Sequence, residues 1–163
     1  MRLIRPKGGE IRTPGMKSQD IPTTEEREIR ALIEGTVIAC QNKDAAALTA
    51  QYAEDVVAFD LINPMQYAGA DAVAQRATQW FSSWEGAFTY EIHDLSVTAS
   101  GDTGFCHSLN HVKGTQTGGQ AIDMWWRATV CCRKTDGKWW VTHLHSSVPF
   151  DMETGKASLD LKP

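Results

Sequence analysis

Four long strand-like runs joined by very short links fill the second half of the chain, and this pattern restricts the possible folds most. The runs cover roughly 87–98, 103–115, 121–134 and 138–150. Turn signals separate them at Ser100-Gly101-Asp102, in the glycine-rich stretch 114–119, and at Thr135-Asp136-Gly137. Because links this short can join only antiparallel neighbours, the sequence predicts an antiparallel sheet in this half.

The first half of the chain has the periodicity of helices instead. Thr23 and Glu26 form the pattern of a capping box, and apolar residues then recur at helical spacing as far as Cys40. The stretch 42–44 ends this first helix and caps a short second one. A third amphipathic helix is predicted after Gly69.

A strand-like run at 56–62 lies between the second and third predicted helices. Together these elements predict an α+β fold in which three N-terminal helices pack on a strongly curved, mainly antiparallel sheet. Such a cone-shaped roll has one open end, where a small-molecule site is expected. We expect an N-terminal extension at 1–20, with Met16 as an alternative start, one domain at 21–152, and a polar tail at 153–163.

Composition excludes several classes of function. A net charge of −4 over 163 residues provides no electrostatic footprint for nucleic acid or for an anionic membrane. No apolar run approaches the roughly 20 residues that cross a bilayer. The basic residues within 1–20 precede no apolar block, so we predict no secretory signal and expect a cytoplasmic protein. The four cysteines form no C-x-x-C pair, which favours buried, reduced thiols.

Asp60 is the most informative carboxylate in the sequence. It lies in an otherwise apolar run, on the same face as Val56, Ala58 and Ile62. Burial raises the pKa of a carboxylate, and a raised pKa suits a general base that works near neutrality. The alternative is a structural role in which this side chain caps the turn at Asn63-Pro64.

The last strand carries the second signal. Two-residue alternation predicts one face made of Trp139, Val141, His143, His145 and Ser147. This face begins apolar and ends in imidazole and hydroxyl groups, as expected where a strand passes from the apolar core to the polar rim of a pocket. Imidazoles titrate at about pH 6.5 and can shuttle protons. The alternative is that both histidines are hydrogen-bonded within the sheet.

The preceding strand places Arg127 on one face with Asp123, Trp125 and Thr129. An arginine beside an aromatic ring can hold an anionic oxygen of a substrate, or it can form a structural ion pair with Asp60 or Asp123. The paired tryptophans of the strands put rings on both faces of the sheet, so a second layer or a second subunit must cover the far face. We therefore expect a homodimer.

A metal site is a further hypothesis. His107 and His111 lie four residues apart on one strand face, and His143 and His145 form a His-x-His pair on another strand. The spacing is unspecific and no carboxylate motif accompanies it. We therefore predict neither a metal nor an organic cofactor.

Three segments carry a resemblance to a known family. The block Gly137–Val141 followed by His143–Asp151 resembles the closing strand of SnoaL-like domains, a branch of the nuclear transport factor 2-like superfamily. Asp60-Leu61 with Pro64 and Tyr67-Ala68-Gly69 resembles the segment before their third helix, and Trp125–Thr129 resembles their penultimate strand. The resemblance covers roughly 23–151 and implies a cone-shaped fold, a pocket between helices and sheet, and a dimer.

The resemblance does not imply one reaction, because the superfamily includes isomerases, dehydratases, cyclases, epoxide hydrolases and non-catalytic assembly domains. One enzyme of similar fold, ketosteroid isomerase, uses an Asp base with an oxyanion hole of Tyr and a protonated Asp. Asp60 matches the base, but this sequence has no tyrosine in its first helix, and the strand at 103–115 offers His107 and His111 where that enzyme has a buried acid. The sequence therefore argues against steroid isomerisation.

We expect a small-molecule enzyme of the isomerase, cyclase or dehydratase type that acts by general acid–base chemistry. In this hypothesis Asp60 removes a proton beside a carbonyl group or activates water, and His143 or His145 relays the proton. Arg127 steadies the developing negative charge. The substrate would be a modest, largely apolar carbonyl compound, contacted by His107, His111, Trp125, Ser147 and Tyr67. The alternative is a non-catalytic ligand-binding or homo-oligomeric assembly domain.

Overall fold

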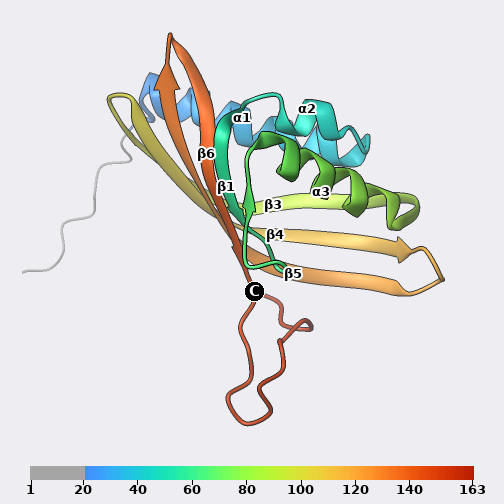
Figure 1. The fold of residues 1–163 in the computed structure, drawn as a ribbon. Coiled ribbons are helices and arrows are strands. Elements are labelled where there is room, and N and C mark those ends of the chain that lie inside the picture. Colours follow the sequence, from blue (N-terminus) through green and yellow to red (C-terminus); the bar gives the residue numbers. More distant parts are fainter. Residues whose placement is uncertain (1–20) are drawn as a thin grey trace, which may run out of the picture.

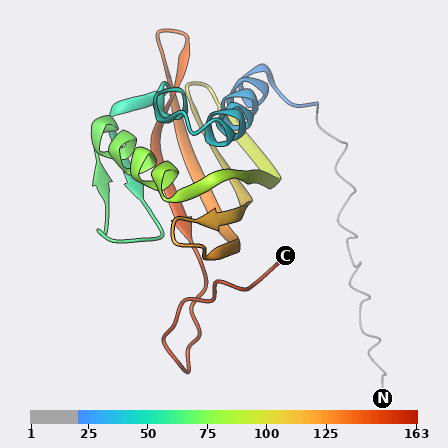
Figure 2. The same ribbon diagram turned by 90° about the vertical axis from the view of Figure 1, so that its right-hand side faces the viewer.

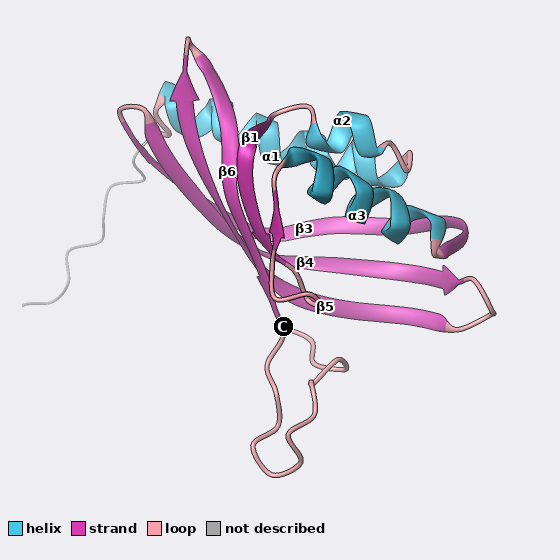
Figure 3. Cartoon of the chain, in the orientation of Figure 1, coloured by secondary structure: helices cyan, strands magenta, loops and turns pink. Residues whose placement is uncertain are grey.

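The computed structural model describes residues 21–163 and shows an α+β fold (Figure 3). The predicted N-terminal extension at 1–20, including Met16, lies outside the described residues. The helices are α1 (Thr24–Gln41), α2 (Ala45–Thr49) and α3 (Ala70–Ser82). The strands are β1 (Tyr52–Phe59), β2 (Tyr67–Ala68), β3 (Trp84–Ser100), β4 (Thr103–Gln116), β5 (Ala121–Thr135) and β6 (Lys138–Ser147).

The helix starts follow from local capping. The Thr23 side chain accepts a hydrogen bond from the Glu26 amide, and the Glu26 carboxylate accepts one from the Thr23 amide, which confirms the predicted capping box. At α2 the Asp44 side chain accepts from the Ala47 amide. α3 follows Gly69, whose φ of 90° is a backbone conformation that favours glycine.

The six strands form one mixed sheet in the order β2-β1-β6-β5-β4-β3. The four long strands β3 to β6 are antiparallel neighbours, as their short links predicted. β1 pairs with β6 in parallel, an arrangement that the long connection through α3 and the strands β3 to β5 allows. β1 begins at Tyr52 rather than at 56 and ends at Phe59, so Asp60 follows the strand instead of lying within it.

All three helices lie on one face of the sheet, inside its strong bend (Figures 1 and 2). Irregularities in strand pairing accompany this bend, because an extra residue in one strand increases the local twist. One lies in β3 between His93 and Ser96, where Asp94 has a φ of 52°, and another lies in β6 at Thr142. We call the face that carries the helices the inner face and the opposite one the outer face.

Two apolar clusters fill the space between helices and inner face. The first gathers around Ile29 of α1, Val56 of β1 and Val141 of β6. The second, which we call the inner aromatic cluster, contains Cys40, Ala77, Phe81, Trp84, Phe88, Tyr90, Val112 and Trp126. Three of the four cysteines are buried in these clusters, and all four are free thiols. No helix among residues 21–163 is long and apolar enough to span a membrane.

The extra residue in β6 overturns one sequence prediction. Cys132 of β5 pairs with Val141, but Cys131 pairs with His143, so Thr142 has no partner of its own. Every side chain after Thr142 therefore points to the face opposite to the one that regular alternation predicts. Trp139 and Val141 are buried on the inner face, whereas His143, His145 and Ser147 lie on the outer face. The predicted common face of these five residues is wrong.

Candidate functional site

The sheet divides the predicted site residues into two groups. Asp60 and Tyr67 lie on the inner side with the helices. The others lie on the outer face, as strand pairing and alternation require: His107, His111, Trp125, Arg127, His143, His145 and Ser147. The predicted single pocket that joins Asp60 to the histidines of β6 is therefore not present among the described residues.

On the inner side, Asp60 is held by two hydrogen bonds. One carboxylate oxygen accepts from the Leu61 amide at 2.6 Å, and the other lies 2.6 Å from Nε of Arg76 on α3. The two side chains are 22% and 16% exposed, so solvent screens this ion pair only in part. The pair is oriented by both β1 and α3, and one side of it remains open to solvent.

Arg76 connects Asp60 to the inner aromatic cluster. It lies four residues before Trp80, so the two side chains are neighbours on one face of α3. The Trp80 ring makes edge contacts with Trp84, Phe88 and Tyr90, at centroid distances of 6.2, 5.3 and 6.0 Å. Leu61, beside Asp60 in the chain, also packs against this cluster. The carboxylate therefore lies at the edge of a large apolar surface.

Three polar side chains are buried within that surface. The Ser108 hydroxyl donates to the side-chain oxygen of Asn110 at 2.7 Å, and the Asn110 amide donates to the Tyr90 hydroxyl oxygen at 2.8 Å. Burial raises the pKa of Tyr90 well above its usual range, so its hydroxyl keeps its proton at every physiological pH. Within 21–163, this hydroxyl accepts a hydrogen bond and has no acceptor for its own proton.

Trp84 adds a second buried donor of this kind. Its ring stacks on Phe88 at 4.8 Å, and its Nε1 is the one fully buried side-chain polar atom in the described part of the chain without a hydrogen-bond partner. Buried donors are rarely left without an acceptor in proteins. The inner aromatic cluster therefore contains two donors, the Trp84 indole and the Tyr90 hydroxyl, that an oxygen atom of a ligand could satisfy.

Tyr67 lies opposite Ala58 and so faces the inner side, but its hydroxyl donates to the Asn63 carbonyl at 2.9 Å.

Two hollows stand out on the surface of residues 21–163. One is an open depression of 460 Å³ on α3 that includes Asp71 and Gln75, and the other is a cleft of 140 Å³ between α1 and α2 that includes Gly35. Neither is lined by Asp60 or by a histidine. No residue of the inner aromatic cluster lines either hollow.

On the outer face, the histidines of β6 surround Phe59. The Phe59 ring makes edge contacts with His143 at 4.8 Å and His145 at 5.6 Å, and it is 38% exposed. His143 Nδ1 lies 2.8 Å from the Val57 carbonyl oxygen, which can only accept, so this nitrogen carries a proton. His143 is therefore hydrogen-bonded within the sheet, whereas no side-chain hydrogen bond of His145 is found among the described residues, so the structural alternative holds for one of the two histidines.

Arg127 lies opposite Leu109 and Ser147 and is exposed on the outer face. No ion pair involves it among the described residues, so neither predicted pairing, with Asp60 or with Asp123, is present. His107 lies opposite Thr129 on the same face and is also exposed. Arg127, His107 and Ser147 are therefore available to a partner on the outer face and not to a ligand at Asp60.

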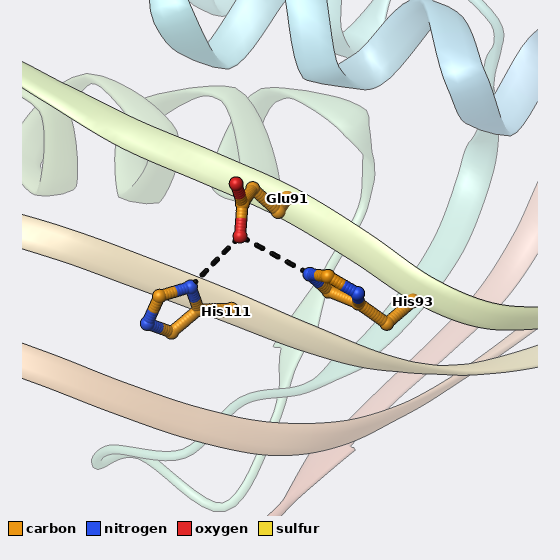
Figure 4. Close-up of side chains that lie close together, drawn as sticks. All are labelled: Glu91, His93 and His111. Atoms are coloured by element: carbon orange, nitrogen blue, oxygen red, sulfur yellow. Dashed lines mark hydrogen bonds and ion pairs between the residues drawn. The ribbon is translucent and has the colours of Figure 1, made fainter. Parts of the chain in front are cut away.

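His111 is the centre of a polar cluster on the outer face (Figure 4). Its Nδ1 lies 3.0 Å from Oε2 of Glu91, and its Nε2 lies 2.9 Å from Oδ1 of Asp123. The same Glu91 oxygen lies 3.1 Å from Nε2 of His93. Burial alone would lower the pKa of His111, but the hydrogen bonds to the two carboxylates outweigh it and raise the pKa. Glu91, His93 and His111 each offer one metal-ligand atom within 4.8 Å of the others.

Several of these residues were missed by the sequence analysis. Arg76 lies at the edge of the apolar stripe of α3, and nothing local indicates that its partner is Asp60. Ser108 and Asn110 lie at two-residue spacing from buried Cys106 and Val112, so periodicity could have placed all four on the inner face. Glu91 and His93 are also two residues apart, so periodicity could likewise have placed them together on the outer face of β3.

Comparison with known proteins places the chain in a family. A SnoaL-like domain model matches residues 29–151. An NTF2-like protein of unknown function from Pseudomonas putida KT2440 is 38% identical, with a TM-score of 0.78 over 85% of this chain and 96% of that one. No functionally curated protein matches the sequence.

Two more distant solved structures are similar in fold. One is a ketosteroid isomerase-like protein from Erwinia carotovora atroseptica SCRI1043, with 24% identity and a TM-score of 0.66 over 76% of this chain and 95% of that one. The other is a proposed calcium/calmodulin-dependent protein kinase II association domain from Xanthomonas campestris, with 21% identity and a TM-score of 0.64 over 74% and 85%. At this level of identity the similarity concerns the fold alone.

Proposed function

Because the chain belongs to the SnoaL-like domain family, we propose that it binds a modest, largely apolar carbonyl compound on the inner side of its sheet and acts on it by general acid–base chemistry. The observation that carries this proposal is the Asp60–Arg76 pair at the edge of the inner aromatic cluster. A fold of this kind hosts several unrelated functions, so the proposal depends on these side chains and not on the fold.

In the proposed reaction, Asp60 accepts a proton from the carbon beside the carbonyl group of the substrate. The electron pair of that C–H bond moves toward the carbonyl oxygen, which becomes an enolate. The Tyr90 hydroxyl and the Trp84 indole are the buried donors suited to this oxygen, and Arg76 holds the carboxylate in place. In a substrate with a C=C bond next to the deprotonated carbon, return of the proton to the far carbon of the resulting dienolate moves the double bond and completes an isomerisation. A base positioned in this way contributes about 10²–10⁴-fold to the rate.

This proposal changes the roles assigned from sequence. His143, His145 and Arg127 lie on the outer face, across the sheet from Asp60, and take no part in the step. The substrate would reach the inner side past the loop at 60–66, where Leu61 covers the inner aromatic cluster and Met65 is 92% exposed. Because Trp84 and Tyr90 are buried, the substrate would have to displace side chains to reach their donors.

Proton exchange tests the proposal without knowledge of the final product. Cyclic ketones, including 2-tetralone and 2-cyclohexenone, are incubated with the protein in D₂O, and loss of the signals of protons beside the carbonyl is followed by ¹H NMR. The wild-type protein should accelerate the exchange of at least one ketone, and Asp60→Asn should reduce this rate by about 10²-fold or more. Asp71→Asn, an exposed carboxylate on α3, is the matched control and should leave the rate unchanged. Exchange at the buffer rate for all ketones, or unaffected by Asp60→Asn, would contradict the proposal.

The outer face favours a second candidate function, that of a homo-oligomeric assembly domain. Phe59 and Phe105 are 38% and 46% exposed there, and the same face carries both acids and bases, which suits a second copy of the chain. In light scattering after gel filtration, the wild type should have twice the 18.0 kDa mass of one chain. Phe105→Glu should produce monomers, whereas Phe150→Glu, in the segment after β6, should not. A wild type that is monomeric at micromolar concentration would exclude this interface.

A further inference from the structure

The cluster around His111 has the composition of a site for a transition metal. Glu91 and His93 lie two residues apart on β3, and therefore point to the same face, and His111 lies directly opposite Glu91 on β4. Two imidazoles and one carboxylate are the ligands that first-row divalent ions such as Zn²⁺, Co²⁺ and Fe²⁺ prefer, whereas Mg²⁺ and Ca²⁺ prefer oxygen ligands alone. The combination is more specific than the four-histidine pattern considered in the sequence analysis.

The spacing of the three ligand atoms suits an ion between them. Ligands bound tetrahedrally to zinc at 2.0–2.1 Å lie about 3.4 Å from one another. Oε2 of Glu91 is already 3.1 Å from the His93 nitrogen and 3.0 Å from the His111 nitrogen. All three atoms lie within 4.8 Å, so small rotations of the rings bring them around one ion. In Figure 4 the carboxylate lies between the two rings.

The surroundings of His111 orient its ring as they do in metal sites. A histidine that binds a metal usually donates its other N–H to a carboxylate, and Asp123 Oδ1 lies 2.9 Å from Nε2 of His111. The second Asp123 oxygen is 3.5 Å from Lys113 and 3.8 Å from Lys162, which hold that carboxylate outside the ligand set. Trp125 stacks on the His111 ring at 4.5 Å and contacts the His93 ring at 4.8 Å.

We propose that Glu91, His93 and His111 bind one first-row divalent cation on the outer face, with Asp123 as the residue that positions His111. His111 is 13% exposed and anchors the site, whereas Glu91 and His93 are 52% and 45% exposed. Three protein ligands leave a coordination position for water or for an anionic ligand. This site is across the sheet from Asp60 and does not depend on the proposed acid–base function.

Cobalt titration of the full chain, without an affinity tag and freed of metal by chelator, tests the proposal. Co²⁺ bound by nitrogen and oxygen ligands absorbs visible light, and the signal should saturate at one ion per chain and disappear when Zn²⁺ is added. Glu91→Gln and His111→Gln should each weaken binding by at least about 10-fold, and Asp123→Asn by about 10–100-fold. His107→Gln and His143→Gln, on the same face but outside the cluster, should bind as the wild type does.

The readouts separate loss of the site from loss of the fold. Far-UV circular dichroism and the melting temperature of each variant are measured in excess chelator. If His111→Gln does not fold, His93→Gln, at a more exposed position, takes its place and should abolish the rise in melting temperature that Zn²⁺ produces in the wild type. Binding that does not saturate, or that survives Glu91→Gln and His93→Gln unchanged, would overturn the proposal.

Discussion

The Asp60–Arg76 pair shows how one residue acquires a role from two distant elements. The carboxylate follows β1, the guanidinium projects from α3, and the 2.6 Å distance between them fixes the end of the strand against the helix. A carboxylate in this position has a stabilising role whether or not it is a base. The two roles can be separated, because the first affects the free energy of unfolding and the second affects proton exchange.

Asp60→Asn should therefore lower the free energy of unfolding by about 1–3 kcal/mol, because a half-buried guanidinium loses a charged partner. Glu34→Gln is the control, since Glu34 forms an exposed pair with Arg30 at 3.9 Å that should contribute less than about 0.5 kcal/mol. Urea denaturation of both variants provides the comparison. Equal decreases in the free energy of unfolding for the two substitutions would mean that Arg76 does not stabilise the fold through Asp60.

The cysteines differ in reactivity for a physical reason. Burial raises the pKa of Cys40 and Cys132 to about 12 and that of Cys106 to about 11, so their thiolates are scarce at pH 8. Cys131 is half-buried on the outer face. Iodoacetamide at pH 8 should therefore modify Cys131 first, as peptide mass spectrometry will show. Equally fast modification of Cys40 in the folded protein would contradict the burial described here.

The same pKa values determine the effect of alkaline pH on stability. In the unfolded chain the thiols lose their protons from about pH 8.5 upward, whereas the folded chain keeps them until pH 11–12. Above pH 8.5 the folded state therefore binds more protons than the unfolded state, and stability falls as the pH rises. The free energy of unfolding should be lower at pH 10 than at pH 8. A higher value at pH 10 would contradict the raised pKa values of the buried thiols.

At the scale of elements, close packing between α1 and the sheet depends on a glycine. A Cβ added at Gly104 of β4 would collide with Ile29 Cδ1 and approach the Thr98 carbonyl oxygen to 3.1 Å, so Gly104→Ala should destabilise the protein by about 1–3 kcal/mol. Gly35 of α1 has nothing within 4 Å of that position, so no neighbour packs closely there. Gly35→Ala should stabilise by about 0.5–1 kcal/mol. The melting temperature should fall for Gly104→Ala and rise for Gly35→Ala. Shifts of the same sign would contradict the packing described for these two glycines.

The elements also show what sequence periodicity can and cannot predict. The capping box at Thr23 and the turn at 135–137 are local, and the helices and strands beside them formed where they were expected. The extra residue at Thr142 has no local signature, because it depends on how β6 pairs with β5. One unpaired residue places His143, His145 and Ser147 on the other side of the sheet, and with them two of the four residues predicted to be catalytic.

For the molecule as a whole, the sheet separates two surfaces with different chemistry. The inner side is aromatic, with few polar groups and the Asp60–Arg76 ion pair at one edge, whereas the outer face carries histidines, carboxylates and exposed phenylalanines. The fold could be predicted because three helices and four long strands have few ways to share one core. The partners of Asp60 and His111 could not, because they come from elements that only the folded chain brings together.

The claim that chemistry takes place on the inner side is tested most directly by the exchange of protons beside a ketone carbonyl, measured in D₂O for two variants in parallel. Asp60→Asn alters the inner side, and the double variant His143→Gln/His145→Gln alters the outer face. We expect exchange near the buffer rate for Asp60→Asn and at the wild-type rate for the double variant. Loss of exchange in the double variant, with Asp60→Asn still active, would contradict it.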